Sequence, residues 1–197
     1  MVVAKGQPLP SSWYDFHLAK NILRGELTRR GKRGQKAPSF VLKDNDMAAD
    51  YKTLAKTIAA LTEGEDDAVA LMATLACELH HSDDRFDWTG FYRVVAPELL
   101  KIGPYQGGHG CLQIPFSRGV CGAAARSGEA QLVADVDSFP GHIACASSTR
   151  SELVLPVWNS AGQLIAVLDI DSDLPNAFTE EDQEQLSAIL QQVFGRP

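Results

Sequence analysis

Hydrophobic residues in the first half of the chain recur at the spacing of amphipathic helices. Apolar side chains lie three or four positions apart over residues 51–61, and a second stripe of the same kind covers residues 68–79. Such spacing gathers apolar side chains on one face of a helix. Gly64 and the acidic residues after it separate the stripes, and carboxylates suit the positive end of the second helix. The pattern predicts two helices joined by a short turn.

The period then changes to that of strands. We expect strands, on the basis of aromatic and β-branched composition, over residues 88–95, 99–105, 131–136, 150–158 and 163–172. Within the first strand, Trp88 and Tyr92 point to one face and Phe91 to the other. The last two strands are joined by Asn159 to Gly162, which suits a β-hairpin.

Two more helices complete the pattern. A short one is expected over residues 119–126, and a longer one over residues 179–194, where Thr179 and Asp182 resemble a capping box. The order of elements predicts an α+β fold, with a mainly antiparallel sheet and N- and C-terminal helices packed on one face. The other face would carry the connections and a ligand. We expect this domain to span residues 46–197.

Charge divides the chain unevenly. The net charge is −7, but residues 1–40 carry +6 and the rest carries −13. We expect residues 1–45 to form a basic, partly disordered extension. Its basic run, residues 24–36, could touch an anionic partner, but we favour a solvated arm. The acidic body argues against a nucleic-acid surface.

The N-terminus has no apolar core of a secretory signal, and no stretch approaches the length needed to span a bilayer. We therefore expect a cytoplasmic protein with no membrane partner. Four cysteines are too few for a secreted disulfide scaffold. In a reducing compartment, clustered cysteines more often serve metal binding, catalysis or redox exchange.

Three cysteines gather in the segment of residues 107–156, which is rich in Gly, Pro, Ser and Ala. Cys111 and Cys145 lie in expected loops, where functional groups are common, and Cys121 lies in the short helix. Cys77 flanks an apolar stripe, so we expect its thiol to serve packing. We infer that this segment presents thiols to a small ligand.

Carboxylates are expected beside these thiols. In the last strand Ile165, Val167, Asp169 and Asp171 alternate onto one face, and the hairpin brings Glu152 of the preceding strand toward the two acids. Clustered, partly desolvated carboxylates have raised pKa values. Such a group could donate a proton to an oxygen near neutral pH, or the cluster could hold a ligand ammonium.

Thiols beside acids favour a redox reaction, in which one thiolate is oxidised to a sulfenic acid and a second cysteine condenses with it. A zinc site is the alternative, with Cys111, Cys121, Cys145 and either His142 or His109 as ligands. These spacings match no common zinc module, so we expect no metal. A serine or cysteine hydrolase lacks its usual signatures here.

Several segments resemble free methionine-(R)-sulfoxide reductases, small enzymes built on the GAF fold. The resemblance covers Tyr51 to Phe194. It rests on IPFSRGVCGAAA (114–125), QLVADVDSFPGHIAC (131–145), STRSELVLP (148–156), DWTGFYR (87–93) and LDIDSDLPNAFTEED (168–182). It implies that free methionine (R)-sulfoxide is reduced to methionine, with no bound cofactor and with a thioredoxin-type protein as electron donor.

The resemblance also implies roles for single residues. Cys145 would attack the sulfoxide sulfur, Cys111 would resolve the sulfenic acid, and Cys121 is the third cysteine of the family. The acidic positions that bind the substrate and donate a proton, and the aromatic positions that contact its methyl-sulfoxide end, correspond to Glu152, Asp169, Asp171, Trp88 and Tyr92. The family suggests a homodimer. A GAF module that senses a small ligand without catalysis is the alternative.

Overall fold

The computed structural model describes residues 49–143 and 145–195, so the expected extension over residues 1–45 lies outside the described residues. The elements are α2 (Tyr51–Leu61), α3 (Ala68–His80), β1 (Trp88–Ala96), β2 (Leu99–Gln106), β3 (Gln113–Pro115), α4 (Gly119–Ser127), β4 (Gln131–Val133), the 3-10 helix η2 (Val136–Ser138), β5 (Ser151–Trp158), β6 (Leu164–Ser172) and α5 (Glu180–Phe194). None of the helices in this described part is long and apolar enough to cross a bilayer.

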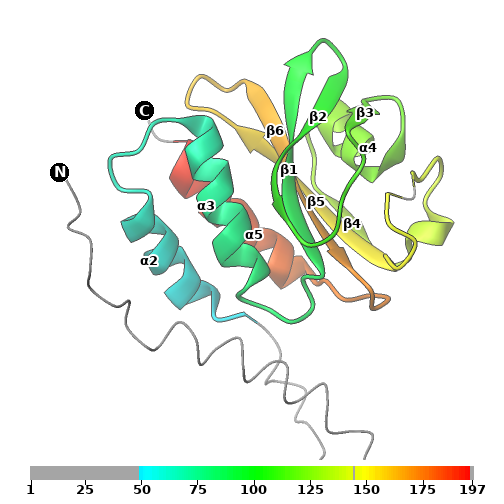
Figure 1. Ribbon diagram of the computed structural model, residues 1–197, viewed down its shortest axis with the longest axis horizontal. Helices are drawn as coiled ribbons and strands as arrows, with labels where there is room; N and C mark the ends of the chain where they lie inside the picture. Colours follow the sequence, from blue (N-terminus) through cyan, green and yellow to red (C-terminus); the bar gives the residue numbers. More distant parts are fainter. Residues whose placement is uncertain (1–48, 144, 196–197) are drawn as a thin grey trace, which may run out of the picture. The chain divides into compact units, whose positions relative to one another are not determined.

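The strands form one sheet in the order β3-β2-β1-β6-β5-β4, and every neighbouring pair is antiparallel (Figure 1). Strands β1 and β6 lie at its centre, although about 70 residues separate them in the chain. The predicted hairpin of β5 and β6 is present, and the Asn159 side chain organises its turn by accepting from the N–H groups of Ala161 and Gln163.

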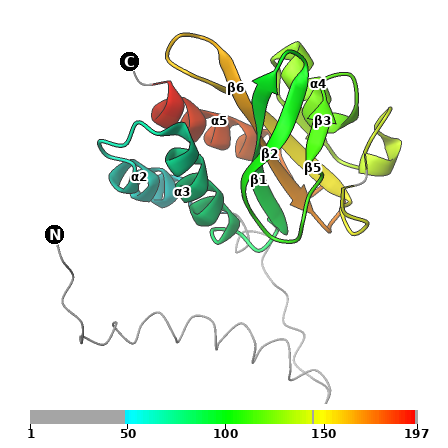
Figure 2. The same cartoon turned by 45° about the horizontal axis from the view of Figure 1, so that its top comes forward.

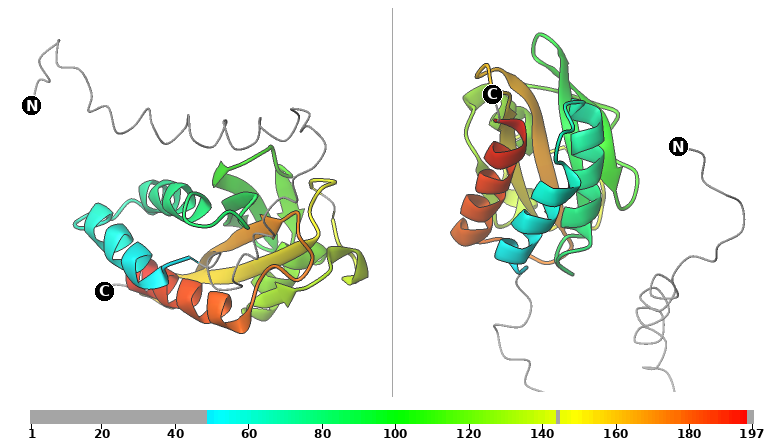
Figure 3. Two further views of the ribbon diagram at one scale, coloured as in Figure 1. Left: turned by 90° about the horizontal axis from the view of Figure 1, so that it is seen from below. Right: turned by 90° about the vertical axis from the view of Figure 1, so that its left-hand side faces the viewer.

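Helices α3 and α5 pack on one face of the sheet, with α2 packed against both of them, and α4 with the loop around η2 covers the other face (Figures 2 and 3). Each face has its own hydrophobic core. Phe91, Leu153, Leu168 and Ile170 point toward the three helices, whereas Tyr92 belongs to the core under α4. The α+β architecture with terminal helices on one face is therefore confirmed.

Local sequence accounts for where the helices begin. The Asp67 side chain accepts from the N–H groups of Val69 and Ala70 at the start of α3. At the start of α5, Thr179 and Asp182 form the predicted capping box. These bonds satisfy backbone donors that have no partner inside the helix.

Two details differ from the sequence-based expectation. The strand expected over residues 131–136 ends at Val133, because the chain turns into η2 at Val136. Ile165 was expected on the face of Val167 but packs against the opposite core. The cause is a bulge, since Val157 pairs with Ala166 and Trp158 with Leu164, which leaves Ile165 without a partner.

Candidate functional site

The candidate site lies on the face of the sheet that α4 and the loop before β5 cover. A cavity of about 20 Å³ opens there, which is room for little more than one water molecule. Its walls are Ile114, Gly119, Val120, Cys121, His142, Ile143, Cys145, Ala146, Thr149, Glu152, Asp169 and Asp171. The predicted cysteine-bearing connection and the predicted acids therefore meet at one place.

Cys111 and Cys145 form a disulfide. Their Cα atoms are 5.2 Å apart, although 34 residues separate them in the sequence. Each cysteine is only partly buried, and the bond ties the glycine-rich loop before β3 to the loop before β5. The disulfide therefore lies beside the cavity, which Cys145 helps to line.

The loop that carries Cys111 rests on two aromatic side chains of β1. The Trp88 indole Nε1 donates to the carbonyl of Gly108 over 2.9 Å, and the Tyr92 hydroxyl lies so close to Gly110 that a Cβ atom there would come within 2.8 Å of it. The Trp88 ring stacks on Tyr92, with ring centroids 5.9 Å apart. Neither ring lines the cavity in the disulfide form, so a contact with the substrate stays a prediction.

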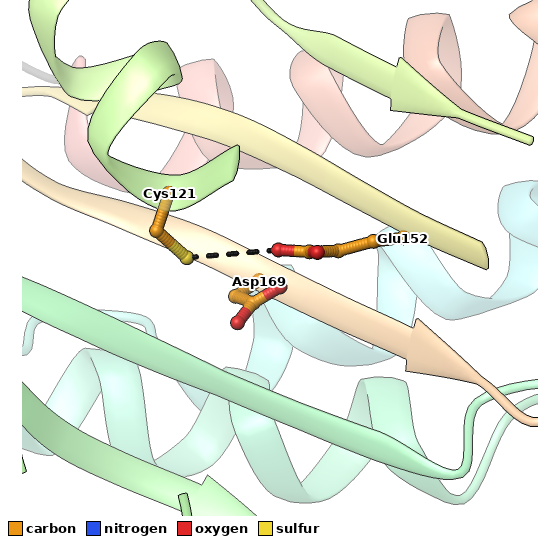
Figure 4. Close-up of side chains that lie close together, drawn as sticks. All are labelled: Cys121, Glu152 and Asp169. Atoms are coloured by element: carbon orange, nitrogen blue, oxygen red, sulfur yellow. Dashed lines mark hydrogen bonds between the residues drawn. The ribbon is translucent and has the colours of Figure 1, made fainter. Parts of the chain in front are cut away.

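The carboxyl groups come together through strand register. Glu152 pairs with Asp171 across β5 and β6, and Asp169 lies two residues before Asp171 on the same face. The Cys121 thiol on α4 donates to Glu152 Oε1 over 3.9 Å, and Asp169 lies beside both (Figure 4). Asp169 Oδ1 is buried with no hydrogen-bond partner among the described residues, so it is available to a ligand donor.

Burial controls the protonation of this cluster. Desolvation raises the pKa of Glu152 and Asp171 well above the usual range, and the charge of Asp169 adds to both shifts. The pKa of Asp169 is raised to about 6 by desolvation, partly offset by hydrogen bonds from Cys121 and Glu152. Burial therefore favours the protonated form of Glu152 and Asp171, in which a carboxyl group can donate a hydrogen bond.

Cys121 is a buried thiol, with 3% of its surface exposed. Desolvation, followed by the charges of Asp169 and Glu152, raises its pKa well above the ordinary value. It therefore stays a neutral thiol in this form, whereas a nucleophile or resolving group needs the thiolate. Cys77 is partly exposed on α3, which lies on the other face of the sheet.

The thiol of Cys121 and the carboxylates of Glu152 and Asp169 offer three ligand atoms within 4.8 Å of one another, so a metal ion could be held there. The alternative zinc set of three cysteines and a histidine is not assembled, because two of its thiols are joined in the disulfide.

Sequence reasoning missed the apolar part of the site. Ile114 on β3, Val120 on α4 and Ile143 in the loop before β5 form its apolar wall. Ile114 belongs to the short apolar run before Gly119, so its position could have been inferred from the sequence. Nothing in the local pattern indicated Ile143.

Comparison with known proteins gives one consistent result. Residues 62–193 match the model of the GAF domain. Free methionine-R-sulfoxide reductase of Escherichia coli is 38% identical over 143 residues, which cover 73% of this chain and 86% of the relative. Protein YtsP of Bacillus subtilis is 43% identical over 143 residues, which cover 72% of this chain and 87% of the relative.

A solved structure agrees with these sequence relatives. The X-ray structure of free methionine-R-sulfoxide reductase from Neisseria meningitidis, in complex with its substrate, aligns with a TM-score of 0.69 and 38% identity. The alignment covers 73% of this chain and 85% of that chain.

Proposed function

Because this chain belongs to the GAF domain family, and to the branch of it that includes free methionine-R-sulfoxide reductases, we propose that it reduces free methionine (R)-sulfoxide to methionine. The observation that carries the proposal is the Cys111–Cys145 disulfide, formed at the rim of a cavity lined by three carboxyl groups. A ligand-sensing domain needs no such reversible thiol pair beside a proton source.

The reaction would proceed in three balanced steps. The Cys145 thiolate attacks the sulfoxide sulfur, and the sulfoxide oxygen takes up a proton. Methionine is then released, and the oxygen stays on Cys145 as a sulfenic acid. The Cys111 thiolate then attacks the sulfenic sulfur, and the hydroxyl group takes up a proton and leaves as water while the disulfide forms. A dithiol donor of the thioredoxin type returns both thiols and itself becomes a disulfide.

The carboxyl groups would serve two needs of this substrate. The sulfoxide oxygen leaves readily only when it is protonated, and the raised pKa values of Glu152 and Asp171 supply an acid near neutral pH. The substrate ammonium needs an anionic partner. The buried Oδ1 of Asp169 could be that partner, because it has no hydrogen-bond donor among the described residues.

The substrate carboxylate would bind at the start of α4. This helix begins at Gly119, lines the cavity with its first residues and has no side-chain cap. Backbone N–H groups at such a helix end favour an anion. Recognition of both the ammonium and the carboxylate would restrict the enzyme to the free amino acid and exclude methionine sulfoxide within a polypeptide.

The disulfide form is closed to this substrate, since its cavity has room for about one water molecule. We therefore propose that methionine sulfoxide enters the dithiol form, in which the Cys111 and Cys145 loops are no longer joined.

A coupled assay tests the proposal. The protein is mixed with thioredoxin, thioredoxin reductase and NADPH, and then with the (R) or the (S) epimer of free methionine sulfoxide. We expect NADPH to be consumed with the (R) epimer alone. Cys145→Ser should abolish turnover, and Cys111→Ser should release about one methionine per enzyme before it stalls. If reduced protein forms no methionine with thioredoxin or with dithiothreitol, the proposal is wrong and a ligand screen for a sensor would follow.

A further inference from the structure

Leu112 is an apolar side chain held in solvent beside the disulfide. It follows Cys111 directly, and 76% of its surface is exposed, more than for any other large hydrophobic residue in the described part of the chain. Its backbone is fixed, because its carbonyl accepts a hydrogen bond from the N–H of Ile102 over 3.1 Å. Single exposed apolar side chains are common on protein surfaces, so the significance of Leu112 lies in its place next to Cys111 of the disulfide.

The stretch of chain that contains Leu112 carries no acidic residue. No Asp or Glu occurs from Leu99 to Gly128, although the chain has 25 acids, and the stretch carries three cationic residues: Lys101, Arg118 and Arg126. Lys101 of β2 pairs with Gln113, the residue next to Leu112. The nearest acid along the chain is Glu98, at the opposite end of the β2–β3 pair, where its carbonyl accepts from Phe116.

The two sulfur atoms of the disulfide therefore have different surroundings. Cys145 lines the cavity together with Glu152, Asp169 and Asp171, whereas Cys111 does not line it. A thiolate that attacks a disulfide carries a negative charge. Its approach to Cys145 through the acidic cavity is electrostatically unfavourable, whereas Cys111 lies outside the lining formed by the three carboxyl groups.

We propose that the segment Gly107–Gln113, which includes Cys111 and the exposed side chain of Leu112, is the docking surface for the dithiol protein that reduces the enzyme. This inference rests on the proposed function. The donor thiolate attacks Cys111 Sγ and forms a mixed disulfide, while Cys145 leaves as a thiolate and takes a proton. The second donor thiolate then attacks the donor sulfur of the mixed disulfide. Cys111 is released, and the two electrons come from the donor pair.

Kinetics with two reductants test the docking surface. Leu112→Asp is compared with Leu61→Asp, which places the same change on a leucine that is 55% exposed on α2, on the other face of the sheet. For Leu112→Asp we expect kcat/KM for thioredoxin to fall at least about tenfold, the equivalent of roughly 1.4 kcal/mol. Turnover driven by dithiothreitol should stay within about twofold of wild type. Leu61→Asp should change neither.

Trapping identifies the sulfur that is attacked and does not require sulfoxide reduction. The oxidised wild-type protein is mixed with a thioredoxin whose second active-site cysteine is replaced by serine, and the mixed disulfide is located by peptide mass. We expect it at Cys111; a mixed disulfide at Cys145 would overturn the proposal.

The other outcomes separate the two proposals. If dithiothreitol supports methionine formation but Leu112→Asp has wild-type kinetics with thioredoxin, the docking surface is wrong and the proposed function stands. If Leu112→Asp lowers the mass of the sedimenting particle from that of a dimer to that of a monomer while thioredoxin kinetics stay unchanged, Leu112 joins two copies of this chain. The proposal is then also wrong. If neither reductant supports methionine formation, the proposed function itself fails.

Discussion

Glu152 of β5 lies directly opposite Asp171 of β6, so two carboxyl groups face each other across an antiparallel pair. Like charges in this position destabilise a sheet. Asp169 lies on the same face, and all three line one small cavity. Their arrangement is costly for folding and suited to binding a cation and donating a proton, as the proposed reaction requires.

The cost should appear as a dependence of stability on pH. The pKa of Asp169 rises from 3.8 to about 6 on folding. Between these values the folded protein binds more protons than the unfolded chain, so the free energy of unfolding falls as pH rises through this window. Below pH 3.8 the full stabilisation is present. We measure the free energy of unfolding by urea titration at pH 4 and pH 7.5. In Asp169→Asn we expect the difference between the two values to be about 1–3 kcal/mol smaller than in wild type.

The control for this prediction is Asp137→Asn, because Asp137 is exposed on η2 and does not line the cavity. It should keep the wild-type slope. If Asp169→Asn also keeps that slope, the buried carboxyl does not titrate in this window and the account of the cluster is wrong.

Cys121 should act as a hydrogen-bond donor and not as a second resolving cysteine. Its thiol is buried, donates to Glu152, and has a raised pKa. Cys121→Ser keeps a donor at this position, so we expect at least about half of the wild-type multiple turnover. Cys121→Ala removes the donor and should raise KM for the sulfoxide by about tenfold, because the Glu152 carboxyl loses its partner.

Alkylation gives an independent measurement. In the reduced native protein at pH 8, iodoacetamide should modify Cys111 and Cys145 and leave Cys121 unmodified until the protein is unfolded. A Cys121→Ser enzyme that stops after one turnover would show instead that Cys121 is required for resolution.

The two aspartates could be placed from the sequence, because alternation within one strand puts Asp169 and Asp171 on the same face. The same alternation correctly separated Tyr92 from Phe91. The Asn159–Gly162 turn indicated that β5 and β6 are neighbours. The pairing of Glu152 with Asp171 also needs the bulge, because the register that starts at Trp158 and Leu164 would otherwise place Glu152 opposite Ile170.

The remaining features depend on contacts between distant segments. Ile165 changes face because of a bulge that arises only when β5 and β6 pair, and no residue pattern within β6 marks it. Trp88 supports a loop 20 residues away through the carbonyl of Gly108. The pattern within β1 shows that Trp88 is buried on one face but not which loop lies over it.

Arg85 should be important for stability and unimportant for chemistry. Its guanidinium contacts Asp83 over 2.7 Å and Asp182 over 2.9 Å, and Asp182 also accepts from the Tyr51 hydroxyl over 2.6 Å. The Asp182 side chain is buried, so Arg85→Met would leave its charge without a cationic partner. We expect a loss of about 3–5 kcal/mol in the free energy of unfolding, measured by urea titration at pH 7.

The double variant Arg85→Met with Asp182→Asn should recover part of this loss, because the uncompensated charge is removed. Folded Arg85→Met should reduce methionine sulfoxide at the wild-type rate at low temperature. A loss below about 1 kcal/mol would show that solvent already screens the cluster.

Gly110 should set the rate at which the disulfide forms. A Cβ atom at this position would lie 2.8 Å from the Tyr92 hydroxyl oxygen and 3.1 Å from Trp88 Cζ2, so the loop bearing Cys111 must move to accept it. Tyr92 is buried and cannot yield easily. In Gly110→Ala we expect the first methionine to be released at the wild-type rate, and the Cys111–Cys145 disulfide to form about tenfold more slowly, a barrier increase of roughly 1.4 kcal/mol.

Gly108→Ala is the matched control, since a Cβ atom there would meet nothing within 4 Å. Single-turnover reactions quenched with an alkylating agent report the disulfide, and dimedone traps the sulfenic acid at Cys145 that should accumulate in Gly110→Ala alone. Equal rates in the two variants would show that the two aromatic side chains of β1 do not position Cys111 for resolution. A slower first methionine in Gly110→Ala would instead place this contact in substrate binding.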